Sequence, residues 1–159
     1  MDESSGLLNI KQWRRCVTID EFFTLFHPYA GQSKSITKLL AQAKKVWLLV
    51  VTIGEGLECK SKEYFNKNEF FRGYIMDRLG SFLVEEEAKK IDLEISRKCQ
   101  EDDYATTRRY SPGYSDFSIK AQQIFFNLVK DAIPELKISP GYLLSPEKTV
   151  TAVKGMIKV

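Results

Sequence analysis

The sequence has few of the residues from which metal, disulfide and acid–base sites are usually built. Its 159 residues include one histidine, His27, and three cysteines. The cysteines (Cys16, Cys59 and Cys99) are odd in number, widely spaced and without a Cys-x-x-Cys pair, which argues against a disulfide framework or a zinc site. No Cys, Asp or Glu stands at ligand spacing from His27, so we interpret it as a helix-end residue without a special role.

Long hydrophobic runs and a strong net charge are also lacking. The strongest apolar run, Val46 to Val51, is much shorter than the roughly 20 residues that span a bilayer. The first residues, MDESSG, are polar and acidic, unlike a signal peptide. A net charge of +3 is too small to indicate nucleic-acid binding, and we interpret a local group of lysines as a solvated helix face: Lys34, Lys38, Lys44 and Lys45. We expect a cytoplasmic protein that binds neither membrane nor nucleic acid.

The order of helical and extended patterns predicts a single α+β domain with a mainly antiparallel sheet. Apolar residues make up 43% of the chain, which is long enough to bury one core. The β-branched run 46–53 predicts a strand buried on both faces, and residues 142–144 and 149–159 read as further strands. Residues 1–19 show no clear periodicity and are left unassigned.

Apolar residues at helical spacing predict four helices. One follows Asp20 as N-cap and ends at His27-Pro28, and the next is capped by Ser33 or Ser35. The longest runs from about residue 68 to 99, and its Gly73 and Gly80 indicate close crossings. The last covers about 118–132. Between strand and long helix, Gly54-Glu55-Gly56 lacks the third glycine of a dinucleotide-binding loop and no helix clearly starts there, so we interpret it as a turn.

The strongest candidate for a binding site is the loop from Arg109 to Tyr114, with the sequence RYSPGY. Arginine offers a rigid fork of donors for a carboxylate or phosphate, and Pro-Gly allows a tight turn close to a ligand. Tyrosine adds a flat face with a polar tip. The alternative is a turn that only connects two elements. The acids 85–87 favour a solvated helix face with the lysines that follow them, although one could face a ligand.

Four stretches in order carry a resemblance to a known family: VTIG from Val51, MDRLGSFLVEE from Met76, RYSPGYSDFSIKAQQ from Arg109 and LLSPEKTVTAVKG from Leu143. Together they resemble the activation (S-adenosylmethionine-binding) domain of cobalamin-dependent methionine synthase, most closely its small free-standing versions. The resemblance divides the chain into an unassigned N-terminal segment, 1–34, and an activation-domain-like part, 35–159. It implies an α+β domain with a curved, mainly antiparallel sheet and flanking helices.

The resemblance also implies a function. In this family the domain binds S-adenosylmethionine and presents it to a cobalamin-binding module for reductive methylation of cob(II)alamin, with an electron from flavodoxin or a similar donor. The expected partner is a cobalamin-dependent methionine synthase or another corrinoid protein, and cobalamin is met only through that partner. The domain positions its ligand and supplies no catalytic side chain of its own. The alternatives are a docking or capping module that no longer binds S-adenosylmethionine, and an unrelated small-molecule binder.

Residue by residue, the resemblance implies roles for the loop. Arg109 matches the arginine that holds the methionine carboxylate, and Ser111 the position whose backbone meets the adenine. Gly113 keeps the backbone tight, and Tyr114 matches the tyrosine of the same loop. Two positions on the long helix complete the set: the family's ligand-facing glutamate aligns with Ser81, and Glu85, one turn later, is the candidate substitute. Where the synthase-attached domain has a Cys-Pro element, this chain has Ser115-Asp116-Phe117.

Overall fold

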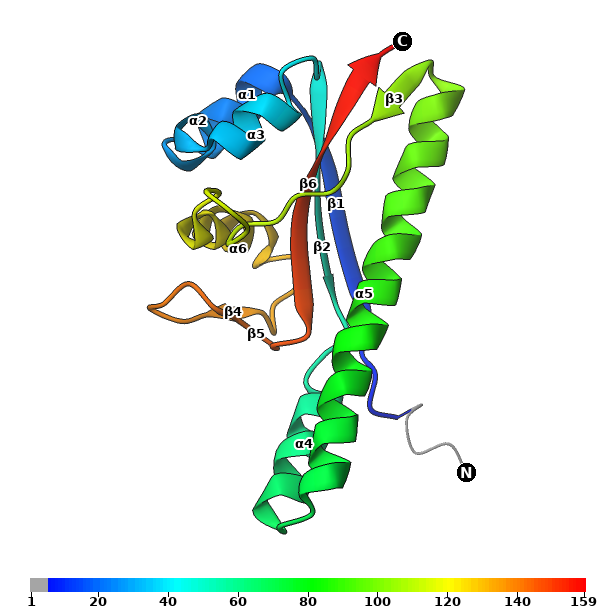
Figure 1. Ribbon diagram of the computed structural model, residues 1–159, viewed down its shortest axis with the longest axis vertical. Coiled ribbons are helices and arrows are strands. Elements are labelled where there is room, and N and C mark those ends of the chain that lie inside the picture. Colours follow the sequence, from blue (N-terminus) through cyan, green and yellow to red (C-terminus); the bar gives the residue numbers. More distant parts are fainter. Residues whose placement is uncertain (1–5) are drawn as a thin grey trace.

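A four-stranded antiparallel sheet forms the centre of the molecule (Figure 1). The computed structural model describes residues 6–159. In spatial order the strands are β1 (Lys11–Thr18), β2 (Lys45–Thr52), β6 (Thr149–Lys158) and β3 (Tyr104–Thr106). Two short strands, β4 (Lys137–Ile138) and β5 (Leu144–Ser145), form a separate hairpin. The predicted α+β class and antiparallel sheet are confirmed.

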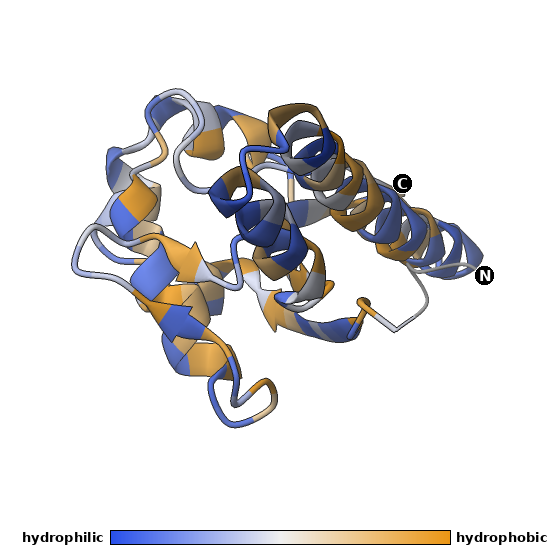
Figure 2. Ribbon diagram, turned by 90° about the horizontal axis from the view of Figure 1, so that it is seen from below, coloured by the Kyte–Doolittle hydropathy of each residue, from blue (hydrophilic) through white to orange (hydrophobic). Residues whose placement is uncertain are grey.

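Helices cover both faces of the sheet (Figure 1). One face carries α1 (Ile19–Leu25), α2 (Tyr29–Gln32), α3 (Lys34–Leu39), the short 3₁₀ turn η1 (Ile119–Ala121) and α6 (Gln122–Val129). The other face carries α5 (Phe70–Glu101), beside which α4 (Gly56–Asn66) lies as an antiparallel partner. The half of α5 next to α4 projects beyond the sheet. Seen from below, the helices show hydrophobic and hydrophilic residues on different sides (Figure 2).

Strand β2 is buried from both sides, as its continuous apolar run predicted. Val46, Leu48 and Val50 belong to the core under α1–α3 and α6. Leu49 and Val51, which point to the opposite face, belong to the core under α5. Successive side chains of a strand alternate between the two faces, so a sheet covered on both faces needs apolar residues at every position.

The N-terminal segment contributes the edge strand β1, which the sequence did not predict. Its eight residues pair with β2 from Lys11 opposite Thr52 to Thr18 opposite Lys45. The alternation of apolar and polar residues that marks a strand is hard to see in β1. An edge strand is only half buried, and charged residues take half of its exposed positions. Thr18 then caps α1 by accepting a hydrogen bond from the Glu21 amide at 3.1 Å, so the predicted cap at Asp20 is wrong by two residues. The comparison of the first residues with a signal peptide concerns residues 1–5, which lie outside the described residues.

The interpretation of residues 54–56 as a plain turn is wrong, because α4 begins at Gly56. Gly54 has a φ of +79°, a left-handed value that favours glycine. A Cβ at Gly56 would collide with the carbonyl oxygen of Leu7. Both glycines are therefore explained by the turn and by the chain that passes over it. The helix was missed because its first residues, rich in glycine and charge, show little periodicity.

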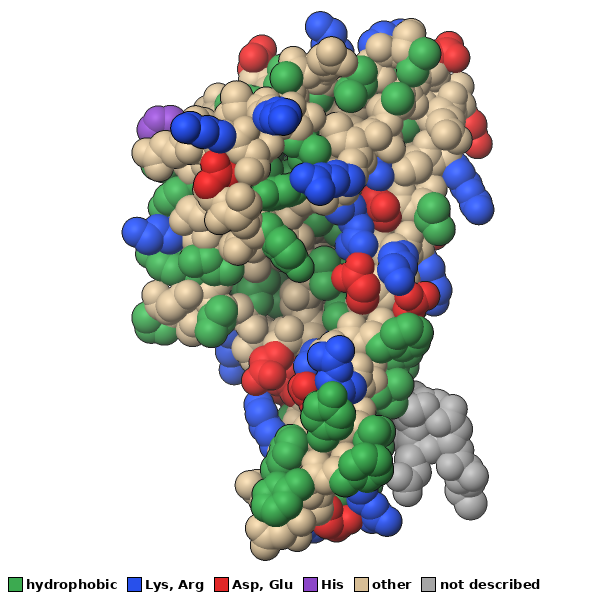
Figure 3. All heavy atoms as spheres, in the orientation of Figure 1, with side chains coloured by type: hydrophobic (Ala, Val, Ile, Leu, Met, Phe, Trp, Pro, Cys, Tyr) green, Lys and Arg blue, Asp and Glu red, His purple; other side chains and the backbone are tan. Residues whose placement is uncertain are grey.

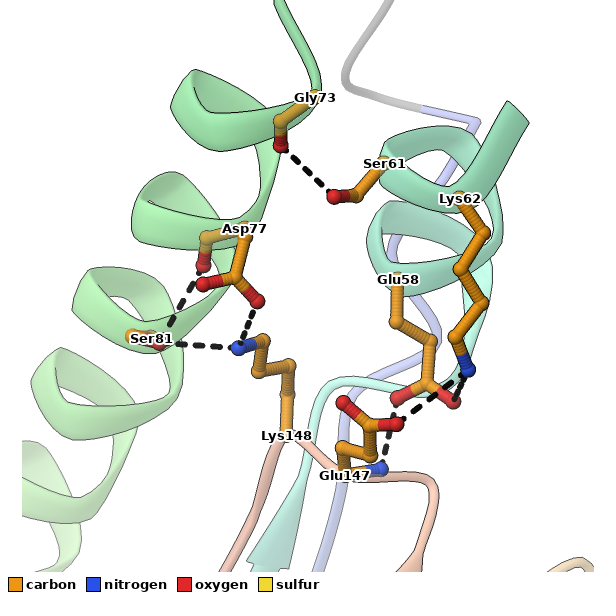
Figure 4. A network of polar contacts seen from close by, with 8 residues as sticks. All are labelled: Glu58, Ser61, Lys62, Gly73, Asp77, Ser81, Glu147 and Lys148. Atoms are coloured by element: carbon orange, nitrogen blue, oxygen red, sulfur yellow. Dashed lines mark hydrogen bonds and ion pairs between the residues drawn. The ribbon is translucent and has the colours of Figure 1, made fainter. Parts of the chain in front are cut away.

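The predicted close crossing at Gly73 is where α4 packs on α5. The Ser61 hydroxyl donates a 2.7 Å hydrogen bond to the Gly73 carbonyl (Figure 4). A Cβ at Gly73 would lie 2.9 Å from the ring of Phe65, which also comes from α4. Glycine at this position therefore allows the two helices to approach.

Gly80 makes room for a side chain from the start of β6. The Lys148 stem lies 3.1 Å from where a Cβ of Gly80 would be. Its ammonium group donates hydrogen bonds to Asp77 at 2.7 Å and to the Ser81 hydroxyl at 3.0 Å (Figure 4). The neighbouring Glu147 amide donates a 2.7 Å hydrogen bond to the buried Glu58 carboxylate of α4. The start of β6 is thus fastened to both helices.

Gly155 offers a test of the packing between β6 and the α3 side. A Cβ there would lie 2.7 Å from Leu40 and 3.2 Å from Ala43, inside a closed core. We expect Gly155→Ala to lower the free energy of unfolding by about 1–3 kcal/mol, because overpacking forces neighbours out of place. Gly31→Ala is the control, since no atom lies within 4 Å of its Cβ position. Denaturant unfolding that shows equal stability for both variants would contradict this packing.

Candidate ligand-binding site

A pocket of about 650 Å³ lies between α5, the predicted binding loop and the start of β6. Its size is typical of small-molecule sites. Four of the predicted site residues line it: Glu85, Arg109, Ser111 and Tyr114. The other lining residues are Asp92, Arg108, Tyr110, Pro112, Gln122, Thr149, Val150 and Thr151. Segments far apart in the sequence therefore form one concave surface.

The Arg109 side chain is held inside this pocket by two carboxylates of α5. Its Nη2 donates a 2.6 Å hydrogen bond to Glu85 Oε1, and its Nε lies 3.8 Å from Asp92 Oδ2. The other oxygen of Asp92 accepts a 2.7 Å hydrogen bond from Lys154, whose side chain is 4% exposed. The four charges alternate in sign, so the buried Lys154 and the partly buried Arg109 each face a carboxylate. The guanidinium is held in one orientation suited to an anion, and it is already paired with two carboxylates of the protein.

The loop that carries Arg109 is attached to β6. Tyr110 and Val153 exchange two backbone hydrogen bonds of 2.9 and 2.8 Å. Gly113 has a φ of +90°, and its amide donates a 2.7 Å hydrogen bond to the carbonyl of the buried Phe117. A side chain at Gly113 would be strained in this left-handed conformation. The Pro-Gly turn therefore has a defined shape, and the strand sets its position.

Two tyrosines give the pocket flat apolar surfaces. The Tyr110 and Tyr114 rings lie 6.4 Å apart, edge to face. Tyr114 is 68% exposed, so most of its ring is open to a ligand. The Arg108 guanidinium lies over the Tyr110 ring at 5.5 Å and forms a cation–π contact. A planar ring can stack here beside a charged group.

The remaining predicted residues lie next to the pocket and not on its surface. Gly113 shapes the loop from within. Ser81 is one turn before Glu85, and its hydroxyl donates to the Asp77 carbonyl at 3.2 Å while accepting from Lys148. The structure therefore brings Glu85, and not Ser81, to the binding loop.

Several lining residues were missed by the sequence analysis. Asp92 lies seven residues after Glu85, two helical turns away on the same side of α5, and this spacing was the available signal. Gln122 accepts a 2.6 Å hydrogen bond from the Thr151 hydroxyl across the pocket wall. Gln122 belongs to a stretch that carried the family resemblance, whereas Asp92 lies after the end of the stretch on α5. Nothing in their local sequence sets them apart from ordinary polar residues.

Asp116 fastens the binding loop to the opposite helical layer. Its carboxylate accepts hydrogen bonds from the Ser33 hydroxyl at 2.8 Å and the Lys34 amide at 2.7 Å, at the first turn of α3. Ser33 also accepts from the Ile36 amide and so is the N-cap, as one of the two predicted alternatives. These bonds, with that from Ser33 foremost, lower the pKa of Asp116 to about 2.

Within residues 6–159, no cluster of three or more His, Cys, Asp or Glu residues is arranged to hold a metal ion. In the same part of the chain, no helix has the length and apolar character needed to cross a membrane. The 32-residue α5 carries charged groups along its whole length.

The molecule has the fold of an α+β reactivation domain, with a four-stranded antiparallel sheet and flanking helices. Among solved structures, it is similar to the crystal structure of the MetH reactivation domain bound to AdoHcy, with a TM-score of 0.59 and 12% sequence identity. The match covers 70% of this chain and 39% of that chain. At this identity the likeness concerns the fold alone. No family model matches the sequence, and no curated protein matches it.

The low pKa of Asp116 predicts how stability depends on pH. Its folded pKa of about 2 lies below the ordinary 3.8, so its contribution is full above pH 3.8 and is lost as the pH falls toward 2. We expect Asp116→Asn to be less stable than the wild type at neutral pH, with a difference that shrinks across this acid range. Thermal unfolding at a series of pH values measures it. Asp131→Asn, an exposed carboxylate after α6, is the control, and a difference that stays constant with pH would contradict the assignment.

Proposed function

We propose that this protein binds S-adenosylmethionine in the pocket at Arg109 and supports reductive methylation of cob(II)alamin in a cobalamin-dependent methionine synthase or related corrinoid protein. One observation supports this most directly. The loop that resembles the family's ligand loop lies at the pocket, in a fold shared with a reactivation domain solved with AdoHcy.

The chemistry of the pocket suits each part of this ligand. S-adenosylmethionine carries a carboxylate, an ammonium group, a sulfonium cation and an adenine. Arg109 provides a bidentate partner for the carboxylate, since its fork is fixed by α5. Glu85 and Asp92 supply negative charge for the cationic groups, and the exposed face of Tyr114 is available to the adenine or to the sulfonium. Ser111 offers backbone groups at the same wall.

The chain's own contribution would be positioning. Holding the methyl donor in one orientation lowers the entropic cost of a methyl transfer that another protein completes. The cobalamin of a corrinoid partner would accept the methyl group, and flavodoxin or a similar protein would supply the electron. We place this activity in the cytoplasm, where such partners work.

The alternative is a docking or capping module for a corrinoid protein that no longer binds S-adenosylmethionine. The observation that favours it is the contact of 2.6 Å between Arg109 and Glu85, because a ligand carboxylate has to displace or share this pair. Titration with S-adenosylmethionine distinguishes the two functions, because the docking function does not require binding of this ligand.

Calorimetric titration with S-adenosylmethionine tests the proposed ligand. We expect Arg109→Ala to weaken binding by about 1.5–3 kcal/mol, which is roughly a 10- to 150-fold rise in Kd, because a charge-assisted hydrogen bond is lost. The exposed Arg97 of α5 lies outside the pocket lining, so Arg97→Ala controls for charge. If the wild type does not bind at millimolar ligand, the first function is wrong and the docking function is supported. If both variants bind with equal affinity, Arg109 does not contact the ligand.

The role of Glu85 is tested by comparing two ligands. Only S-adenosylmethionine carries the sulfonium charge, so the Glu85 carboxylate favours it over AdoHcy. Glu85 is 46% exposed, and screening limits the effect of one charge to about 0.2–1 kcal/mol. We expect Glu85→Gln to lower the affinity for S-adenosylmethionine more than that for AdoHcy. An equal change for both ligands would show that Glu85 does not sense the charge.

A further inference from the structure

The projecting half of α5 carries a band of exposed aromatic and aliphatic side chains that the proposed function does not use. The exposed fractions are 61% for Phe70, 77% for Phe71, 56% for Tyr74, 45% for Ile75 and 60% for Phe82. Hydrophobic side chains gather over the lower part of α5 in the space-filling view (Figure 3). Gly73 and Gly80 face Phe65 of α4 and Lys148, so α4 and β6 cover another side of the helix. We call these five residues the α5 stripe.

One row of this surface has a regular order. Residues four apart lie above one another on a helix, and such rows form the ridges by which helices pack. The row along α5 reads Phe70, Tyr74, Arg78, Phe82, and every member is exposed. The row therefore offers two outer phenylalanines with a tyrosine and an arginine between them.

Arg78 is the unpaired charge in this row. Within residues 6–159 the Arg78 side chain makes no hydrogen bond, ion pair or ring contact. The carboxylate of its neighbour in sequence, Asp77, pairs with Lys148 instead. Aromatic residues and arginine are the types enriched at the centres of protein interfaces.

We propose that the α5 stripe is a homodimer interface, in which two copies of α5 pack antiparallel about a two-fold axis between Tyr74 and Arg78. The reversed row places Phe70 against Phe82 of the second copy and Tyr74 against its Arg78. Each guanidinium then lies over a tyrosine ring, and the two-fold axis makes every contact twice. A second copy is favoured because the row is complementary to itself in this register, with no acidic residue required from the partner.

The exposed area is sufficient for such a contact. Aromatic side chains bury about 150–250 Å² each, so the stripe leaves on the order of 600 Å² of mainly apolar surface in water. This is at the upper limit for a patch on a monomeric protein and near the roughly 800 Å² per partner of a standard interface. This half of α5 projects beyond the sheet (Figure 1).

Sedimentation equilibrium on the complete chain tests the interface. We expect the wild type to show a concentration-dependent monomer–dimer equilibrium. Phe82→Glu removes both phenylalanine pairs and places a carboxylate in each apolar contact, and Arg78→Glu removes both cation–π contacts. We expect each to raise the dimer dissociation constant by at least about tenfold. Both side chains are exposed in the monomer, so the variants are expected to keep the wild-type circular dichroism spectrum.

The control is Leu143→Glu, at a side chain that is 65% exposed in the β4–β5 hairpin, away from α5. It should leave the dimer unchanged. A wild type that stays monomeric up to about 0.5 mM would overturn the proposal. The proposal would also be overturned if neither α5 substitution weakens the dimer, or if Leu143→Glu weakens it equally. Either result would show that the dimer forms through another surface.

Discussion

Two buried lysines, Lys148 just before β6 and Lys154 within it, determine how the long helix lies on the sheet. The Lys148 and Lys154 side chains are 10% and 4% exposed, and their ammonium groups pair with Asp77 and Asp92 of α5. A cation in this environment is strongly destabilising without its partner, so each lysine requires a carboxylate at one place. Six residues of strand span about 20 Å and fifteen of helix about 22 Å, so both pairs form only when α5 runs alongside β6 in the same direction.

The pair of Lys154 and Asp92 also belongs to the candidate site, because Asp92 lines the pocket. Asp92 uses one oxygen for Lys154 and turns the other toward Arg109. Glu85, two turns earlier in the helix, accepts a hydrogen bond from the same arginine. The packing of α5 on the sheet and the position of the arginine therefore depend on the same carboxylate. The second attachment of the loop, from Tyr110 to Val153, reaches the same strand. A site of this kind is preorganised because its charges lie on a helix and a strand, and not on a free loop.

Much of the fold was predictable where a pattern reflects burial on a regular element. The run 46–53 predicted β2, and the apolar spacing between residues 68 and 99 predicted α5 to within two residues at each end. Strand β1 and helix α4 were not predicted. Both are partly exposed and rich in charge, so their local sequences resemble loops. They are held by pairing with β2 and by packing on α5, which are contacts between distant residues.

The candidate site divides in the same way. The binding loop was recognisable because arginine, Pro-Gly and tyrosine within six residues form an unusual local combination, and Gly113 does take the positive φ that its residue type allows. The alignment of the sequence with the family could not decide whether Ser81 or Glu85 lies at the binding loop. The answer depends on which turn of α5 faces Arg109. Glu85 contacts Arg109, whereas the Ser81 hydroxyl accepts a hydrogen bond from Lys148.

The sequence by itself determined the class of fold and the doubly buried strand, and it predicted a candidate binding loop, because each of these was inferred from local residue patterns along the chain. The tertiary structure decided which charges meet. Asp92, Lys154 and Arg109 come from three separate segments, and only the packing of α5 along β6 brings them within ion-pair distance. Electrostatic pairing falls off with distance in space, and sequence separation carries little information about it.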